Sequence, residues 1–213
     1  MSEDESDGDL PGYGGGTSYW DNRYLESTAP FDWLETYSDL RPHIDCVSCG
    51  NRDISILDAG CGNSLLAEQL YDDGYRNITS IDNSQVVVQQ MIARQQQTAR
   101  PELQWLCMDV LEMSFPDSSF DLVIDKSLLD TLMCTSGPAG DTSAYLQGVF
   151  RILRSRGTLM CVSYGKPETR EYLFELQRRD SEFAFKLYTC ELPAHHDAAG
   201  PHYLYLVVKV PLF

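Results

Sequence analysis

The sequence of 213 residues has no apolar run long enough to cross a membrane, and no basic-then-apolar segment at its start. A membrane-spanning helix needs about 20 consecutive apolar residues, and a secretory leader needs a charged start followed by an apolar core. From these two absences we expect a soluble, cytoplasmic protein without a membrane partner. The length suits one domain with a substantial core, and we expect it to be a monomer.

Basic residues are scarce: 16 lysines and arginines stand against 32 aspartates and glutamates, for a formal net charge of −16. A nucleic-acid-binding protein needs a basic face for the phosphates, so we expect no nucleic-acid partner. Five of the acids lie in the first ten residues, ahead of a glycine run at 14–16. We expect residues 1–16 to form a disordered acidic leader, and residues 17–213 to form a single domain.

Grouped cysteines and histidines are also missing. The cysteine count is seven, an odd number, and no export signal accompanies it, so we expect reduced thiols. Cys46 and Cys49 have the spacing of half a zinc knuckle, but no second Cys or His pair follows at a suitable distance. A loop ahead of a strand is therefore preferred there, and no metal is expected. The four histidines, at 43, 195, 196 and 202, show no catalytic spacing, and we expect surface or loop positions for them.

Short apolar strands alternate with helical patterns along most of the chain. Strands are predicted over 54–58, 78–82, 103–108, 120–125, 157–163, 183–190 and 202–210. Helices are predicted over 63–73, 84–97 with Ser84 as the cap, 142–153 and 168–178. The alternation is typical of an α/β fold: an open, mostly parallel seven-stranded sheet with helices on both faces and an antiparallel hairpin at one edge.

Polar residues and glycines follow the first four predicted strands. In open parallel sheets, ligands bind beyond the carboxyl ends of the strands. The candidates at those ends are Asp58, Gly60, Gly62, Asn63, Asp82, Asn83, Met108, Asp109, Val110, Asp125 and Lys126. We expect them to form one ligand-binding site.

The turn DAGCG at 58–62 distinguishes among nucleotide-like ligands. A dinucleotide site needs a third glycine where this chain has Leu65, and the phosphate-binding pattern G-x-x-x-x-G-K-[ST] is absent. Asp82 lies twenty residues beyond the second glycine, where a carboxylate can accept hydrogen bonds from both ribose hydroxyls. Asp109 can accept from an adenine amine, with the Val110 amide facing the ring. Ribose and adenine recognition without a phosphate site indicates S-adenosylmethionine, with S-adenosylhomocysteine as the product.

The motifs between residues 54 and 162 resemble those of class I S-adenosylmethionine-dependent methyltransferases. They combine the DAGCG turn, the acids at 82 and 109, and FPDSSFDLVIDK at 115–126. The resemblance implies a Rossmann-like class I methyltransferase fold and a methyl-transfer enzyme.

A narrower resemblance begins outside this core. The runs that carry it are YWDNRY at 19–24, PFDW at 30–33, GNS at 62–64, VVV at 86–88 and DKSLLD at 125–130. They are similar to motifs of the methyltransferase-like eukaryotic lysine methyltransferases that act on translation elongation factor 1-alpha. The resemblance implies a protein substrate with a lysine acceptor, and a cofactor site walled by Trp20, Tyr24 and Trp33, whose rings can shield the sulfonium. The two tryptophans could instead anchor an N-terminal helix on the sheet.

The sequence departs from that family at two places. The family commonly has KGTLD where this chain has KSLLD at 126–130, and PGG where it has SRG at 155–157. The first departure lies beside the expected acceptor channel, so it concerns the substrate more than the cofactor. The run YGKP at 164–167 could form the other lip of that channel, or be only a turn.

A lysine acceptor must lose its proton, because its pKa is ordinarily about 10.4 and the ammonium has no lone pair. An apolar channel favours the neutral amine, and the proton can leave to solvent or to a base. We expect Asp125 and Asp130 to steer the charged lysine at the mouth. Lys126 is expected to contribute its backbone at the cofactor rim, although its side chain could be a surface charge.

Two other functions compete with protein-lysine methylation. Small-molecule methyltransferases share the core motifs but often add a lid, for which only the N-terminal segment is available here. An Asn/Asp-Pro-Pro-Tyr motif, which indicates amino groups of bases or glutamine, is missing after the fourth strand. A non-catalytic binding module would be expected to lose the glycine turn or the ribose acid, and this chain keeps both.

Overall fold

A computed structural model of the chain describes residues 15–136, 140–180, 184–193 and 200–211. Most of the predicted acidic leader lies outside these ranges, as do His195 and His196. The first described helix, α1 (Gly16–Glu26), begins at the last residue of that predicted leader. Among the described residues, no helix combines the length and apolar character needed to span a membrane.

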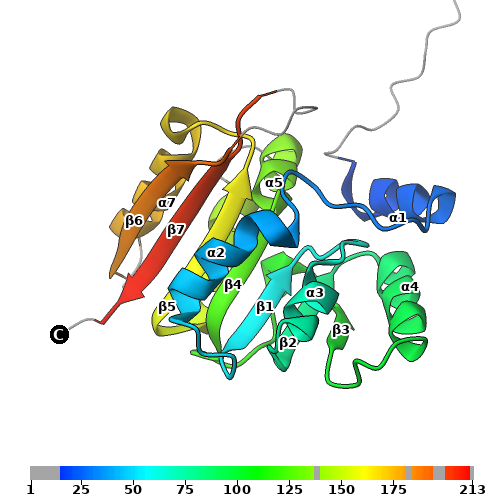
Figure 1. Cartoon of the computed structure of the whole chain (residues 1–213). Helices are drawn as coiled ribbons and strands as arrows, with labels where there is room; N and C mark the ends of the chain where they lie inside the picture. The colour runs from blue at the N-terminus through cyan, green and yellow to red at the C-terminus, as the bar shows by residue number, and fades with distance from the viewer. Residues whose placement is uncertain (1–14, 137–139, 181–183, 194–199, 212–213) are drawn as a thin grey trace, which may run out of the picture.

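Within the described residues, a seven-stranded sheet has the order β3-β2-β1-β4-β5-β7-β6 (Figure 1). The strands from β3 to β5 pair in parallel, whereas β7 pairs antiparallel with both β5 and β6. The strands are β1 (Ser55–Ala59), β2 (Asn77–Asp82), β3 (Gln104–Cys107), β4 (Phe120–Lys126), β5 (Leu153–Ser163), β6 (Ala184–Glu191) and β7 (Tyr203–Val210). The predicted sheet, with its antiparallel edge hairpin, is confirmed.

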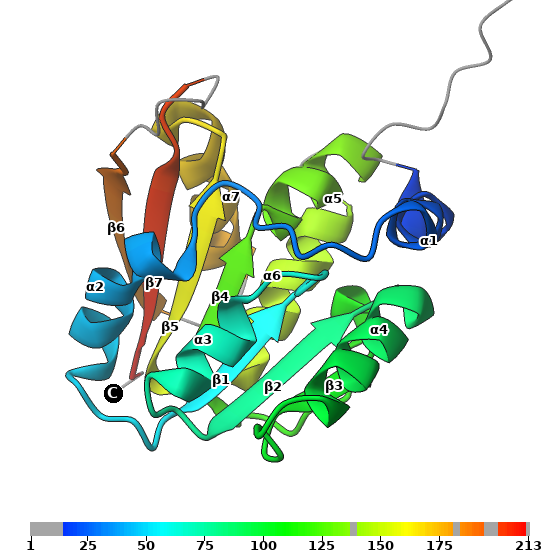
Figure 2. The same ribbon diagram turned by 45° about the vertical axis from the view of Figure 1, so that its right-hand side comes forward.

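Helices cover both faces of the sheet (Figures 1 and 2). Side chains of α2, α3 and α4 share one apolar core with one face of the sheet, and those of α5, α6 and α7 share a second core with the other face. The helices are α2 (Tyr37–Ser48), α3 (Leu66–Asp72), α4 (Gln85–Gln96), α5 (Leu128–Ser136), α6 (Asp141–Ile152) and α7 (Pro167–Asp180), with the short 3-10 helix η1 (Val110–Glu112).

The helix ends follow local capping. Ser84 caps α4 as predicted, because its hydroxyl accepts from the backbone N–H of Val87 at 3.3 Å. Helix α3 starts later than the predicted residue 63, because residues 60–65 form the glycine turn and the Ser64 hydroxyl accepts from the Leu66 N–H at 3.0 Å.

Helix α2 corrects the prediction of a loop around the two neighbouring cysteines. It starts at a capping box in which Thr36 and Asp39 satisfy each other's backbone N–H groups. Cys46 lies in its last turn, and Cys49 is its C-cap, with a φ of 50°. Among the described residues, no group of three or more potential metal ligands could hold an ion.

Candidate active site

A cavity of about 510 Å³ lies at the carboxyl ends of β1, β2 and β4. Sites for cofactors and small ligands commonly occupy about 300–1,000 Å³. Of the predicted site residues, those lining the cavity are Trp20, Tyr24, Trp33, Asp58, Gly60, Gly62, Asn63, Asp82, Asn83, Asp109, Val110, Lys126 and Asp130. Met108 and Asp125 do not line it. The structure therefore brings most of the strand-end residues together with the N-terminal aromatic residues.

The glycine turn after β1 is sterically closed to larger residues. Gly60 and Gly62 have φ values of 66° and 52°, in the left-handed region that favours glycine. A Cβ on Gly62 would lie 2.7 Å from the Tyr24 hydroxyl, and one on Gly60 would lie 3.0 Å from Leu128 Cδ1. The turn thus presents bare backbone to the cavity.

Asp82, at the end of β2, holds this turn in place. One carboxylate oxygen accepts from the Gly62 N–H and the other from the Ser84 N–H, both at 2.9 Å. The side chain is buried, and burial raises its pKa, while the two backbone hydrogen bonds oppose that rise. The remaining lone pairs of this carboxylate are available to ribose hydroxyls.

Asp109 lies on the next strand end along the sheet. It caps η1 by accepting from the Leu111 N–H at 2.9 Å, and its exposed side chain lines the cavity. Val110 is buried beside it. An exposed carboxylate and a buried apolar residue thus lie together at this edge of the cavity.

Three aromatic rings from the N-terminal segment form one wall of the cavity. Trp20 stacks on Tyr24 with ring centroids 6.1 Å apart, and meets Trp33 edge-on at 6.2 Å. Trp20 also packs against the core shared by α2, α3 and α4. Trp20 and Tyr24 therefore both line the cavity and anchor the N-terminal helix on this core, and Trp33 lines the cavity.

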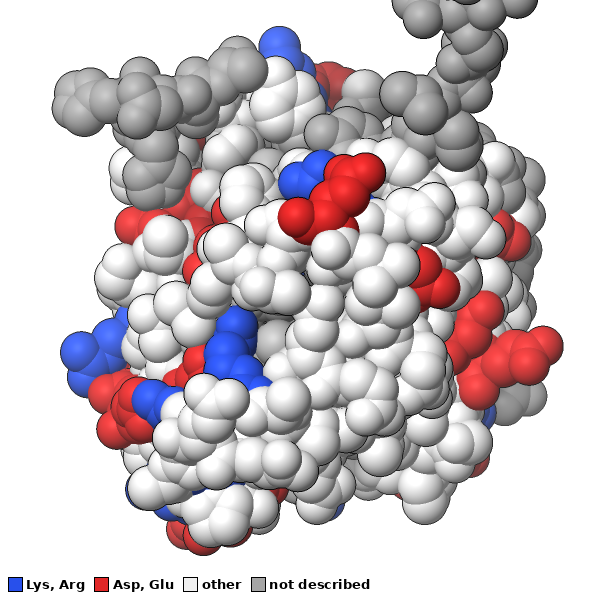
Figure 3. Space-filling view, turned by 90° about the vertical axis from the view of Figure 1, so that its right-hand side faces the viewer, with Lys and Arg blue, Asp and Glu red and all other residues white. Residues whose placement is uncertain are grey.

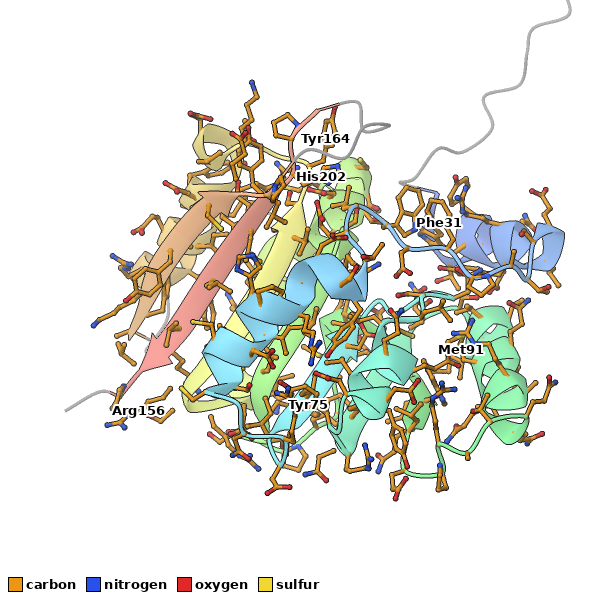
Figure 4. All side chains as sticks on the ribbon, in the orientation of Figure 1. Phe31, Tyr75, Met91, Arg156, Tyr164 and His202 are labelled. Carbon is orange, nitrogen blue, oxygen red and sulfur yellow. The ribbon has the colours of Figure 1, made fainter. Side chains whose placement is uncertain are left out.

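Residues 27–36, here called the strap, connect α1 to α2 and pass over the strand ends (Figures 1 and 2). The Asn63 side-chain amide donates to the Ala29 carbonyl oxygen at 2.7 Å. At the far end of the strap, Glu35 Oε1 lies 2.8 Å from Nδ1 of His202, at the start of β7 (Figure 4). Both Glu35 and His202 are buried, so the histidine lies just before β7 as a buried partner of the strap and not at the surface.

An ion pair joins the middle of the strap to β4. Lys126 Nζ lies 2.8 Å from Asp32 Oδ1, and the Ser64 hydroxyl donates to the same carboxylate oxygen. The Lys126 side chain is only 6 % exposed, so the alternative of a surface charge is wrong.

Asp58 lies on the cavity floor near this ion pair. Burial raises the pKa of its carboxyl group to about 7, although the nearby Lys126 ammonium opposes the shift. Asp32 and Asp82 add to the rise through their negative charges. A bound cation would favour the ionised carboxylate, so the floor can hold an ammonium group.

The prediction that Asp125 steers a substrate at the cavity mouth is wrong. Its side chain is fully buried, and its carboxylate accepts from the Tyr145 hydroxyl and the Leu128 N–H, both at 2.9 Å, and from the Leu129 N–H. Burial raises its pKa to about 7. Asp125 therefore caps α5 from inside the protein.

Asp130 does line the cavity, but its carboxylate already forms an ion pair with Arg170. Its carboxylate accepts from the Ser163 hydroxyl, from the Tyr164 N–H at 2.9 Å and from Arg170 Nη2 at 2.9 Å. A steering role for Asp130 would require it to compete with this guanidinium group.

Sequence reasoning missed one side of the cavity. Helix α5 supplies Leu128, Leu132 and Cys134, and Phe31 comes from the strap. A signal was present, because Ser127, a residue type common at helix N-caps, directly precedes the apolar run LLDTLM.

A sequence model of the family described as "Methyltransferase domain" matches residues 57–161. The eEF1A lysine and N-terminal methyltransferase of Homo sapiens is 37 % identical over 152 residues, which cover 70 % of this chain and 21 % of that protein. The EEF1A lysine methyltransferase 4 of Mus musculus is 30 % identical over 187 residues, covering 83 % of this chain and 72 % of that protein. The chain thus spans about a fifth to a quarter of the first relatives, but most of the mouse protein.

Solved structures support the fold. The N-methyltransferase NodS of Bradyrhizobium japonicum, in complex with S-adenosyl-L-homocysteine, has a TM-score of 0.64 and is 17 % identical, covering 91 % of this chain and 99 % of that one. The 1,6-didemethyltoxoflavin-N1-methyltransferase of Burkholderia thailandensis has a TM-score of 0.60 and is 19 % identical, covering 82 % of this chain and 79 % of that one. At these identities the similarity concerns the fold.

Proposed function

Because the chain belongs to the S-adenosylmethionine-dependent methyltransferase family, we propose that it transfers a methyl group from S-adenosylmethionine to a lysine side chain of a protein. The observation that carries the proposal is the single cavity in which the glycine turn, the acids of β1 and β2, and the aromatic wall meet. The names of the relatives support elongation factor 1-alpha as the substrate to test first.

The cavity residues fit this cofactor by their chemistry. Asp82 offers carboxylate oxygens to the ribose hydroxyls, and Asp109 offers them to the adenine amine. The bare backbone at Gly60 and Gly62, with Asp58 below it, suits the amino-acid tail and its ammonium group. When bound, S-adenosylmethionine supplies a methyl group activated by its sulfonium, and the rings of the aromatic wall can stabilise that charge.

The chain's own contribution to the reaction is positioning and exclusion of water. On the acceptor side, Leu128 and Leu132 line the cavity with apolar surface. An amine entering there is desolvated, which lowers its pKa and favours the neutral, nucleophilic form. Since Asp125 is buried and Asp130 is paired with Arg170, we assign proton loss to solvent at the mouth.

The proposal also covers the location, the oligomeric state and the partners of the enzyme. We propose a cytoplasmic, monomeric enzyme without membrane or nucleic-acid partners, in keeping with the net charge of −16. The face over α1 and α4 carries few charged side chains across its middle (Figure 3). A basic substrate would therefore gain little attraction from that face.

The test is methyl transfer from radiolabelled S-adenosylmethionine in a cell lysate, with and without added purified elongation factor 1-alpha. Label in a discrete protein band, mapped to lysine by mass spectrometry and lost with Asp82→Ala, would support the proposal. Label confined to the small-molecule extract would show a small-molecule methyltransferase instead. No label above the Asp82→Ala background in either fraction would favour a non-catalytic module.

A further inference from the structure

We propose that Tyr164 receives the acceptor side chain at the cavity mouth, and that Asp130 and Arg170 are positioning residues that hold it there. The inference rests on the proposed function. It concerns the end of β5 and the two residues after it, residues 163–165, here called the β5 lip.

Tyr164 is an unusual surface residue. It lines the cavity, yet its side chain is 50 % exposed (Figure 4). Its ring centroid lies 6.0 Å from that of His202, which is itself fixed to the strap through Glu35. A large aromatic ring is thus kept at the mouth without being buried.

The backbone around Tyr164 is fixed by hydrogen bonds from both sides. Its own N–H donates to Asp130 Oδ2 at 2.9 Å, and the Gly165 N–H donates to the Ser163 hydroxyl oxygen at 3.0 Å. The Ser163 hydroxyl in turn donates to the other Asp130 oxygen. One carboxylate of α5 therefore binds two consecutive residues of the β5 lip.

Arg170 of α7 completes the network. Its Nη2 donates to Asp130 Oδ1 at 2.9 Å and its Nε to the Ser163 hydroxyl oxygen at 3.1 Å. The guanidinium lies so close to the lip that a Cβ on Gly165 would be 2.3 Å from Arg170 Cζ. On the other side, the Tyr205 hydroxyl of β7 donates to the Gly165 carbonyl oxygen at 2.6 Å.

A simple turn after a strand does not need this much support. Here a mostly buried ion pair, and contacts from α5, α7 and β7, all converge on the backbone that carries one half-exposed ring. The arrangement explains why Asp130 lines the cavity although its charge is paired. The role of Asp130 is to fix the backbone of the β5 lip, which holds the Tyr164 ring at the cavity mouth.

The ring favours an acceptor with an aliphatic stem and a cationic end. An aromatic face attracts an ammonium group by cation–π interaction, and packs against methylene groups at the same time. A second exposed ring, Phe31 of the strap, also lines the cavity and is contacted by the Arg23 guanidinium, 5.7 Å from its centroid. A lysine side chain entering past Tyr164 would have its stem on aromatic surface before its amine reached the apolar interior.

The experiment compares Tyr164→Ala, Tyr164→Phe, Asp130→Asn and the double variant Tyr164→Ala/Asp130→Asn. The matched control is Tyr188→Ala, which removes an equally exposed tyrosine of β6 that does not line the cavity. Initial rates of lysine labelling are measured at increasing concentrations of dialysed lysate protein, after subtracting the label formed without added enzyme. Calorimetry gives the affinity of each variant for S-adenosylhomocysteine.

We expect Tyr164→Ala to raise the apparent KM for protein by about threefold to thirtyfold, the range of a cation–π contact, with kcat and cofactor affinity little changed. Tyr164→Phe should keep KM within about twofold, because the aromatic face remains. Asp130→Asn should raise KM when Tyr164 is present, but add nothing to Tyr164→Ala, because the two residues act through one ring.

The outcomes separate this inference from the proposed function. Absence of lysine labelling by the wild-type enzyme would overturn the proposed function, and the inference with it. Lysine labelling with an unchanged KM in Tyr164→Ala would overturn the inference alone. An equal loss of cofactor affinity in Tyr164→Ala would also overturn it, by making the ring part of the cofactor wall. Additive effects in the double variant would refute the positioning role of Asp130.

Discussion

The ion pair between Asp32 and Lys126 ties the strap to the cavity floor, and Asp32→Asn tests it. The asparagine keeps the shape of the side chain and an acceptor for the Ser64 hydroxyl, but removes the negative charge 2.8 Å from Lys126 Nζ. Because the Lys126 side chain is 6 % exposed, the substitution leaves a nearly buried cation without its counterion. We expect lower stability and weaker cofactor binding.

The magnitude follows from the surroundings of the pair. Breaking a fully buried ion pair by removing one partner costs about 3–5 kcal/mol. The Asp32 side chain is 17 % exposed, and Asp58 lies near Lys126 as a second carboxylate. Loss of the Asp32 charge removes one cause of the raised Asp58 pKa, so Asp58 ionises more readily and replaces part of the lost interaction. We therefore expect Asp32→Asn to lower the free energy of unfolding by about 2 kcal/mol.

Lys126→Met is the matched control, because it removes the opposite charge. The carboxylate left behind is the more exposed partner and retains the Ser64 hydrogen bond, so we expect a loss of only about 1 kcal/mol. The larger loss of unfolding free energy in Asp32→Asn than in Lys126→Met is the result that tests the argument from burial. Chemical denaturation measures both, and acrylamide quenching of tryptophan fluorescence reports the strap, since two of the three tryptophans, Trp20 and Trp33, lie in the N-terminal segment.

If the strap stays closed in only one Asp32→Asn molecule in ten, the apparent affinity for S-adenosylhomocysteine falls about tenfold. Equal losses of stability in the two single variants would refute the argument from burial. Unchanged cofactor affinity together with unchanged quenching would refute the argument that this pair holds the strap.

The remaining predictions concern the cavity floor and the first core. Asp82→Ala should weaken S-adenosylhomocysteine binding by about a hundredfold, and also lower stability by about 1–3 kcal/mol because the Gly62 N–H loses its acceptor, as calorimetry and denaturation would show. Gly62→Ala should destabilise the turn, and Tyr24→Phe should restore part of the loss by removing the hydroxyl 2.7 Å from the new Cβ. Burial raises the folded-state pKa of Asp125 to about 7 from an unfolded value of about 3.9, so the folded protein holds a proton that the unfolded chain has lost. Since the pKa of Asp58 is also raised to about 7, stability should fall as the pH rises from about 4 to about 7 and then level off, and Asp125→Asn should remove only the share of the fall that Asp125 contributes, as denaturation at each pH would show.

The sheet and the cofactor side of the cavity could be predicted because their signals are local. A buried strand followed at once by DAGCG, or by an acid, is visible within a few residues, and the parallel sheet brings such ends together. The helix cap at Ser84 is predictable for the same reason, because it directly precedes the helical pattern of α4. The strand pattern, together with the glycines and acids at the strand ends, therefore predicts that residues from different strands meet at one edge of the sheet.

The missed parts have identifiable physical causes. Pro42 lies inside α2 and removes a backbone donor, so the sequence there does not predict a helix. The apolar residues Leu40 and Ile44 nevertheless have helical spacing. Asp125 lies near the carboxyl end of its strand, as Asp58 and Asp82 do, but its side chain turns to Tyr145 and α5. Residue spacing does not encode the direction of a side chain. The pairing of Lys126 with Asp32 joins positions 94 residues apart, which no local pattern contains.

The strap also has a consequence for the order in which the site can be completed. It is made early, but its anchor at Glu35 needs His202, 167 positions later. At a synthesis rate of about 5–20 residues per second, the strap would wait about 8–35 s for that partner. During this interval the strap would be held only by its earlier partners, Asn63 and Lys126. Full closure of the strap would therefore report that β7 has been made and inserted between β5 and β6, because Glu35 is anchored only when His202 is in place.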